Sequence, residues 1–240
     1  MRGCRERRIR AVIFDSGGTL VYDKGFSRLL PEKISTALKV LAGLEVPPSR
    51  IEKLWECSEW RREDVELWDL ARVMFLLRGL GLTPNVRLSE LVYASVLEAY
   101  LEGFELERSA PSVLRELKEA GFKLGILTNV GSYDLVKLRY EREGLLDLFD
   151  VVIASQAFPW RKPSRRIFEA ACYLLGVEPV EAVYVGDDAQ LDIAGAKAAG
   201  LYAIQVLKHA REKSRLADAW IETIEELPSA VEELVRFSSG

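Results

Sequence analysis

The sequence predicts an α/β protein whose core is a doubly wound parallel β-sheet, with one all-helical domain inserted into that core. One observation is a set of short segments, such as "AVYVG", that are rich in β-branched residues and apolar on both faces. Parallel strands that helices cover on both sides have this composition. A second observation is that helical patterns alternate with these segments along the chain, which is typical of a doubly wound sheet. A third is that the alternation is interrupted once, between residues 21 and 106.

Five segments are predicted to be the strands of the sheet. They are residues 10–14, 123–127, 150–154, 182–186 and 202–206. After the interruption, four amphipathic patterns predict helices, and each pattern ends at a glycine, the residue that most often follows a helix C-terminus. The helices are predicted over residues 112–120, 133–143, 164–175 and 191–199, and the glycines are Gly121, Gly144, Gly176 and Gly200.

Residues 21–106 are predicted to form a separate helical domain, so that the core domain comprises residues 1–20 and 107–240. Runs within this block have the apolar spacing of amphipathic helices, and no part of it has a convincing strand pattern. Ligands of open α/β sheets bind beyond the carboxyl ends of the strands, and the block leaves the core at such an end. We therefore expect it to form a cap over the site. Its tryptophans are expected in the core of the cap or at its seam with the sheet rather than on a substrate, and they are Trp55, Trp60 and Trp68.

The composition excludes several classes of function. The 240 residues have a formal net charge of −4, which gives no positive field for nucleic acid, and no apolar run is long enough to span a membrane. The basic start "MRGCRERRIR" lacks the apolar segment of a signal peptide, and the three cysteines are scattered, so a cytoplasmic location is predicted. The scarcity of Asn and Gln beside abundant Arg, Glu and Leu is associated with heat-adapted proteins. No pattern predicts an oligomeric state.

Polar residues follow four of the predicted strands, at the ends where those strands leave the sheet. They are Asp15 after the first strand, Thr128 and Asn129 after the second, Lys162 after the third, and Asp187, Asp188 and Asp192 after the fourth. Because the carboxyl ends of parallel strands meet at one edge of the sheet, these side chains are expected to converge. Each has an ordinary explanation when taken alone, such as a helix cap for Thr128 or a solvated surface for Lys162. Together they predict a site.

The motifs around these residues resemble those of the haloacid dehalogenase superfamily, in the subgroup that carries a helical cap between the first and second motifs. "FDSGGTL" is similar to the first motif of that family, "ILTNVG" to the second, "KPSRRIF" to the third and "VGDDAQLDIAGAKAAGL" to the fourth. The four occur in the family's order, and the resemblance covers nearly the whole chain. It implies a Rossmann-like core and a Mg²⁺-dependent hydrolase, namely a phosphatase of a small phosphorylated metabolite, with neither nucleic acid nor membrane as a partner.

The chemistry of the residues agrees with this resemblance. A carboxylate is a useful nucleophile toward phosphorus when a cation offsets its repulsion with an anionic substrate, and Asp15 with Asp187 supplies hard oxygen ligands suited to Mg²⁺. The resemblance implies an aspartyl-phosphate on Asp15 and a further metal ligand in the carbonyl oxygen of Gly17.

The resemblance also implies roles for the remaining residues. Thr128, Asn129 and Gly18 would bind the phosphoryl oxygens, and Lys162 would screen the nucleophile and the developing charge. Asp188 and Asp192 would hold Lys162 or metal-bound water, outside the direct ligands of the metal.

Gly17 departs from the family's pattern. Phosphatases of the family carry a second aspartate there, which protonates the leaving group and then activates water, and such acid–base catalysis is worth about 10² to 10⁴ in rate. The rate of hydrolysis is therefore predicted to depend steeply on the pKa of the leaving group, unless another residue is the acid. Tyr22 and Asp23 are the nearest candidates, and His209, the single histidine, is interpreted as a surface residue.

Two alternative functions follow from Gly17. One is a regulatory protein that binds metal and phosphate with little turnover. The other is a phosphonate-cleaving hydrolase, whose relatives have a small residue at this position but also need a cap lysine that forms a Schiff base, for which Lys53 is the candidate. Dehalogenating relatives usually lack the acidic fourth motif, so "GDDAQLD" argues against them.

Overall fold

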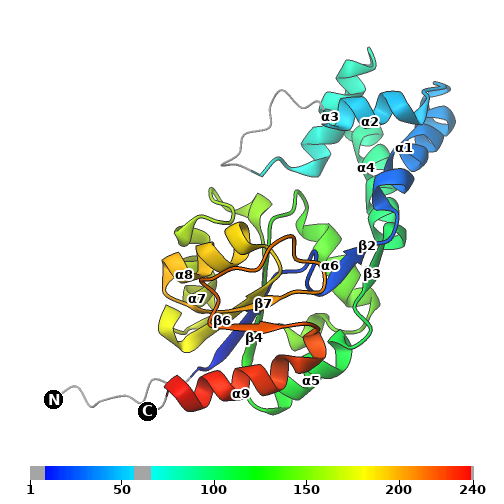
Figure 1. Cartoon of the computed structure of the whole chain (residues 1–240). Coiled ribbons are helices and arrows are strands. Elements are labelled where there is room, and N and C mark those ends of the chain that lie inside the picture. The colour runs from blue at the N-terminus through cyan, green and yellow to red at the C-terminus, as the bar shows by residue number, and fades with distance from the viewer. Residues whose placement is uncertain (1–8, 57–65, 239–240) are drawn as a thin grey trace.

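The computed structural model describes residues 9–56 and 66–238, and its centre is a six-stranded parallel sheet with the strand order β5-β4-β1-β6-β7-β8 (Figure 1). The strands are β1 (Ala11–Phe14), β4 (Lys123–Thr128), β5 (Val151–Ala154), β6 (Ala182–Gly186), β7 (Tyr202–Val206) and β8 (Ala219–Ile221). The α/β class and the five predicted strands are confirmed. The edge strand β8 was not predicted, because three residues are too few to show a periodic pattern.

Helices cover both faces of the sheet. They are α5 (Ala110–Glu119), α6 (Tyr133–Arg142), α7 (Arg165–Leu175), α8 (Gly195–Ala199) and α9 (Leu227–Ser238). Val12 and Phe14 of β1 belong to an apolar layer that includes residues of α5, α6 and α9, whereas Ala11 and Ile13 belong to the opposite layer, with residues of α7 and α8. Since consecutive strand residues point to opposite faces, a strand between two layers needs apolar side chains at every position.

In its described residues, 21–56 and 66–106, the block between β1 and α5 contains four helices with a hydrophobic core of their own. The helices are α1 (Phe26–Ala42), α2 (Pro48–Glu56), α3 (Asp69–Gly79) and α4 (Val86–Gly103). Their shared core includes Ile34, Ile51, Leu77 and Val96, all fully buried. Figure 1 shows these helices apart from the sheet, at the upper right.

The block is not entirely helical, which corrects the sequence-based expectation. Its first and last residues form β2 (Val21–Asp23) and β3 (Phe104–Leu106), which pair antiparallel as a two-stranded ribbon between the core and the helices. Each strand has three residues and is partly exposed, so neither shows the alternation by which strands are found in a sequence.

The helical block touches the core beside the carboxyl end of β4. The backbone N–H of Asp69 donates to the carbonyl oxygen of Gly131 at 2.7 Å, and the hydroxyls of Tyr93 and Ser132 are hydrogen-bonded. The buried Arg139 of α6 donates to two carbonyl oxygens at the end of α4, each at 2.9 Å. Within the described residues, no helix is both long and apolar enough to cross a membrane.

Candidate active site

The carboxyl ends of three neighbouring strands open into one cavity of about 710 Å³. Asp15 follows β1, Thr128 is the last residue of β4, and Asp187 follows β6. The residues that line the cavity come from loops at this edge, and they are Asp15, Gly17, Thr128, Asn129, Lys162, Asp187, Asp188, Ala189, Gln190, Leu191, Asp192, His209, Arg211 and Glu212. All the residues predicted for the site line this cavity except Gly18.

Lys162 is the centre of the hydrogen bonds in the cavity floor. Its ammonium is 3% exposed and donates to Asp15 Oδ1 at 2.7 Å, to Asp192 Oδ1 at 2.6 Å and to the hydroxyl of Tyr184 at 3.0 Å. Burial alone opposes the charge on Lys162, but the carboxylates of Asp15 and Asp192 override this effect and raise its pKa. Lys162 therefore stays a cation, held against the predicted nucleophile with all three of its N–H donors engaged.

Asn129 fixes the backbone of Lys162. Its side-chain amide donates to the carbonyl oxygen of Lys162 at 3.0 Å and accepts from the Lys162 backbone N–H at 2.9 Å. This reciprocal pair uses the amide oxygen and one of the two amide N–H donors of Asn129. The side chain of Asn129 thus positions Lys162, and its binding of a phosphoryl oxygen stays a prediction.

The two acidic residues of the fourth motif that were expected outside the metal ligands have different surroundings. Asp188 directly precedes a π-helix, Ala189–Ala194, and Asp192 lies within it; the Ile193 N–H donates to the carbonyl of Asp188 at 3.1 Å. Asp188 Oδ1 caps this turn by accepting from two backbone N–H groups at 2.8 Å each. Asp192 is 1% exposed, and its second oxygen accepts from the Asp188 N–H at 3.0 Å. Of the two, only Asp192 contacts Lys162.

Gly17 and Gly18 differ although they are neighbours in one turn. Gly17 lies on the cavity wall and forms an isolated bridge with Val21. Gly18 has a φ of +85° and is not among the lining residues, and its N–H, the donor expected to bind phosphate, donates to the carbonyl of Val21 at 2.8 Å. Position 18 requires glycine for a steric reason, because a Cβ there would lie 2.5 Å from Asp187 Oδ2.

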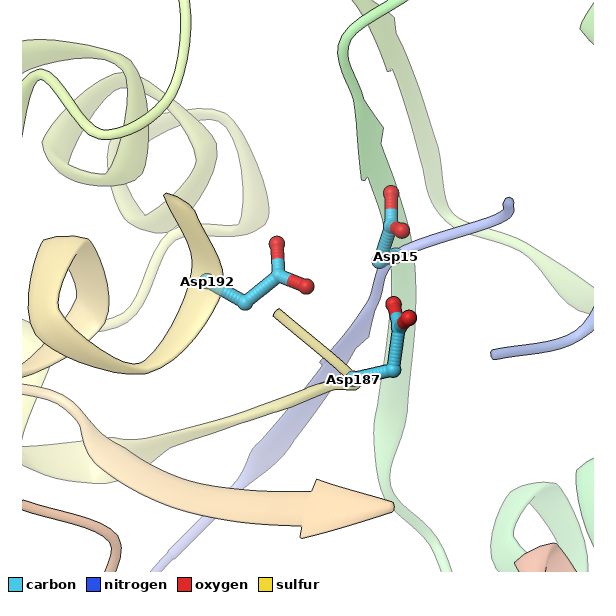
Figure 2. A group of neighbouring side chains, drawn as sticks. All are labelled: Asp15, Asp187 and Asp192. Carbon is cyan, nitrogen blue, oxygen red and sulfur yellow. The ribbon is translucent and has the colours of Figure 1, made fainter. Parts of the chain in front are cut away.

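The oxygen atoms at the centre of the site suit a hard cation. One carboxylate oxygen each of Asp15, Asp187 and Asp192 lies within 4.8 Å of the others, and Figure 2 shows the three side chains converging. Burial, together with the charges of Asp15 and Asp192, raises the pKa of Asp187 to about 7. Asp187 forms no ion pair with a described residue, so its charge is one that a bound cation would offset.

The three carboxylates do not all have the same partner: some are suited to bind Mg²⁺, whereas Asp192 binds Lys162. Both oxygens of Asp192 already accept hydrogen bonds, and burial raises its pKa to about 6 against the opposing effect of Lys162. The carboxylates of Asp15 and Asp187 are therefore the pair that best suits Mg²⁺, and the carbonyl of Gly17, a residue of the cavity wall, stays a predicted ligand.

Sequence reasoning missed several polar residues of the site, among them Gln190 and Glu212 on the cavity wall. The Tyr184 hydroxyl, inside β6, accepts from Lys162 and donates to the Leu127 carbonyl oxygen at 2.8 Å. Gln205 in β7 is fully buried and bonded to the backbone of Asp187. Both are polar residues within apolar strands, which is the signal that could have found them. Arg211 had no such signal, since it lies in an exposed loop.

The structure also places the residues of the alternative interpretations. Asp23 caps α1 by accepting from the backbone N–H groups of Gly25 and Phe26 at 2.7 and 2.8 Å. Lys53 is exposed on α2 and does not line the cavity. Trp55 belongs to the core of the helical block, where it is 8% exposed.

The expected positions of Trp68, Trp60 and His209 can be compared with the structure in turn. Trp68 is 43% exposed and directly precedes α3 at the seam with the core. Trp60 lies outside the described residues. His209 is exposed, as expected, but it also lines the cavity.

Comparisons with known proteins agree with this geometry. Residues 9–200 match the haloacid dehalogenase-like hydrolase family. The chain is 32% identical to a glyceraldehyde 3-phosphate phosphatase of Methanopyrus kandleri, over 95% of this chain and 99% of that protein. The crystal structure of a phosphatase from Thermococcus onnurineus superimposes with a TM-score of 0.70 at 28% identity, over 93% of this chain and 98% of that one. A 2-haloacid dehalogenase from Pseudomonas syringae has a TM-score of 0.74 at 24% identity, over 94% and 99%, and shares the fold.

Proposed function

The chain belongs to the haloacid dehalogenase-like hydrolases and is an enzyme of their phosphatase type, and we propose that it cleaves a small phosphate ester through an aspartyl-phosphate on Asp15. The observation that carries the proposal is the contact of 2.7 Å between Lys162 Nζ and Asp15 Oδ1 on the floor of the cavity, beside Asp187. A buried carboxylate paired with a cation in this way is held in a fixed position, as a nucleophile requires.

The proposed reaction has two steps at Asp15. In the first, a carboxylate oxygen of Asp15 attacks phosphorus and the bond from phosphorus to the leaving oxygen breaks. In the second, water attacks the aspartyl-phosphate, which releases inorganic phosphate and restores the carboxylate. Thr128 and the backbone of Asn129 would hold the phosphoryl oxygens at the end of β4, while the charge of Lys162 stabilises the negative charge that develops on them.

Mg²⁺ fits the same proposal as the cofactor. Held by Asp15, Asp187 and the Gly17 carbonyl, it would neutralise part of the charge shared by the nucleophile and the phosphoryl group. Asp192 then serves to position Lys162, and Tyr184 and Asn129 hold the same lysine from its head and its backbone.

We also propose that residues 21–106 act as the cap of this site. Support comes from the seam between Asp69 and Gly131, two residues after Asn129 on the loop that follows β4. Since the cavity is lined only by core residues within the described part of the chain, the cap is expected to supply contacts to the organic part of the substrate when it closes.

The test is a comparison of wild type with Asp15→Asn and with a control, Asp134→Asn, whose carboxylate lies on the exposed first turn of α6. With Mg²⁺, wild type and the control should release phosphate from glyceraldehyde 3-phosphate or 4-nitrophenyl phosphate, and chelator should stop the release. Acid-quenched wild type should carry one phosphoryl group on the peptide that contains Asp15. Full turnover in Asp15→Asn would exclude the mechanism, and activity that survives excess chelator would exclude the metal.

The glycine at position 17 favours one second candidate, a protein that binds metal and phosphate with little turnover. The same quenched samples distinguish it. A phosphoryl group that stays on Asp15 for many minutes without release of phosphate would support the binding protein rather than the phosphatase.

A further inference from the structure

The loop that joins β7 to β8 forms one wall of the candidate active site. His209, Arg211 and Glu212 of this loop line the same cavity as Asp15 and Gly17. His209 is the single histidine of the chain, and imidazole is the side chain that most often transfers protons in catalysis near neutral pH.

One buried amide ties this loop to the proposed metal ligand. The side-chain nitrogen of Gln205 donates to the carbonyl oxygen of Asp187 at 3.0 Å and to that of Glu212 at 2.8 Å. Its oxygen accepts from the backbone N–H of Ser214 at 2.7 Å. Although its surface is exposed, the loop is thus anchored from below to the residue that would hold Mg²⁺.

Tyr22 holds the imidazole beside the turn that contains Gly17. The rings of His209 and Tyr22 lie 4.2 Å apart between centroids. Tyr22 directly follows Val21, the bridge partner of Gly17, and its hydroxyl donates to the Thr19 carbonyl oxygen at 3.0 Å. The ring contact therefore connects His209 to the same turn that, in the family, carries the acid.

The other candidate acids near this turn are committed elsewhere. Asp23 caps α1. Burial and the neighbouring Glu107 raise the pKa of Tyr22, so its phenol is a poor proton donor. Lys208, beside the ring of Tyr22, forms an ion pair with Glu107 at 2.6 Å. Glu212 remains as the competing proton donor on the same loop, so the experiment includes it.

We propose that His209 is the general acid and base of this enzyme, in place of the residue missing at position 17; this inference rests on the proposed phosphatase function. In the first step, as the oxygen of Asp15 bonds to phosphorus, the imidazolium gives its proton to the departing alkoxide, which leaves as an alcohol. In the second, the neutral imidazole takes a proton from the attacking water as the aspartyl-phosphate is cleaved. The imidazolium is restored, and phosphate leaves.

The experiment measures kcat/KM for two substrates with opposite needs. Glyceraldehyde 3-phosphate has an alkoxide leaving group that requires protonation, whereas the phenolate of 4-nitrophenyl phosphate leaves without it. In His209→Ala and His209→Gln, kcat/KM for the alkyl ester should fall by about 10² to 10⁴, and that for the aryl ester by much less. Arg215→Ala, an exposed change in the same loop, should alter neither.

A second variant supplies the rescue. Since a Cβ at position 17 would meet no described residue within 4 Å apart from its two chain neighbours, Gly17→Asp can be combined with His209→Ala. It should restore most of the lost alkyl activity, and in that background the presence of His209 should matter little. A merely structural role for His209 would give no such rescue, and thermal denaturation of each variant verifies folding.

The remaining outcomes would each overturn the role of His209, either alone or together with the phosphatase function. Equal losses for both esters, no loss for either, or an alkyl-specific loss in Glu212→Gln instead would overturn the assignment of His209 and leave the phosphatase intact. If wild type cleaves only the aryl ester and His209→Ala does the same, no acid operates, and the inference again fails alone. Failure of wild type to release phosphate from either ester would overturn the proposed function and the inference together.

Discussion

At the scale of single residues, Gly17 and Gly18 form a matched pair for testing the metal site. A Cβ at Gly17 would meet nothing within 4 Å, whereas one at Gly18 would collide with the carboxylate of Asp187. We predict that Gly17→Ala folds and binds Mg²⁺ like wild type. Gly18→Ala should lose more than about 1 kcal/mol of stability, because its φ is also left-handed, and should bind Mg²⁺ more weakly. Thermal denaturation and calorimetric titration with MgCl₂ measure both effects, and equal affinities in the two variants would contradict the placement of Gly18.

Asp187 predicts a pH dependence of stability in the metal-free protein. Burial and neighbouring carboxylates raise its pKa from 3.8 to about 7 in the folded state. The folded state therefore binds the proton more tightly than the unfolded chain, and stability depends on pH through this difference. The contribution is fully present below pH 3.8 and is lost as the pH rises through 7.

The measurement is the melting temperature of metal-free wild type minus that of Asp187→Asn, from pH 4 to pH 8. This difference should fall as the pH rises, since only wild type acquires the buried charge, and saturating Mg²⁺ should reverse the fall in wild type alone. Other carboxylates, such as Asp150 with its lowered pKa, cancel in the difference. If the melting temperatures of the two proteins change with pH by the same amount, the charge of Asp187 is not destabilising.

At the scale of elements, the contact between the helical block and the loop after β4, where the Asp69 N–H donates to the Gly131 carbonyl, depends on the absence of a side chain at Gly131. A Cβ there would lie 2.5 Å from Asp69 Oδ1 and 2.6 Å from the carbonyl oxygen of Leu67. We predict that Gly131→Ala forces the segment before α3 away from the core, with the cost of about 1 to 3 kcal/mol that overpacking carries. Each kcal/mol should lower the melting temperature by about 2 to 4 °C. An unchanged melting temperature would mean that the seam is looser than the structure shows.

The elements also show which signals in the sequence were sufficient. Strands β1, β4, β6 and β7 are mostly buried on both faces and consist mainly of apolar residues, so composition alone identified them. The ribbon of β2 and β3 has no such signal. Its pairing joins residues more than 80 positions apart, as with Val21 and Leu106, and its short strands gain their structure from this contact rather than from a local pattern.

At the scale of the whole molecule, the ribbon provides a way to remove the cap. Asp23 and Phe104 stand opposite each other in its register, so a two-residue Asn-Gly turn can replace residues 24–103 and close β2 and β3 as a hairpin. The sheet domain has its own hydrophobic layers on both faces, and we predict that it folds without the helices. It should retain cleavage of 4-nitrophenyl phosphate but lose selectivity among natural esters, measured as the ratio of their kcat/KM values.

The shortened protein is also the control for the seam. Leu67 and Asp69 are absent from it, so Gly131→Ala should have no destabilising effect there. A shortened protein that does not fold, or one with unchanged selectivity, would contradict the assignment of residues 21–106 as an independent cap.

The candidate site was predictable in its main residues but not in how they act on one another. Asp15, Lys162 and Asp187 were found because each follows a strand, and parallel strands bring their carboxyl ends to one edge. The use of the Asn129 amide on the peptide of Lys162, and of Asp188 as a helix cap, follows from hydrogen-bond directions that no spacing in a sequence encodes.

The sequence by itself determined the α/β class, the segments that form the main strands, the position of the helical insertion and the edge at which the site lies. These follow from apolar periodicity and from the topology of parallel sheets, which are local or general properties. Only the tertiary structure decided that His209 lies on the wall of the cavity, against Tyr22 and in the loop that Gln205 anchors. The physical reason is that these residues belong to two segments distant in the chain, and their contacts depend on how the loop between β7 and β8 packs against the turn after β1, not on any pattern within one segment.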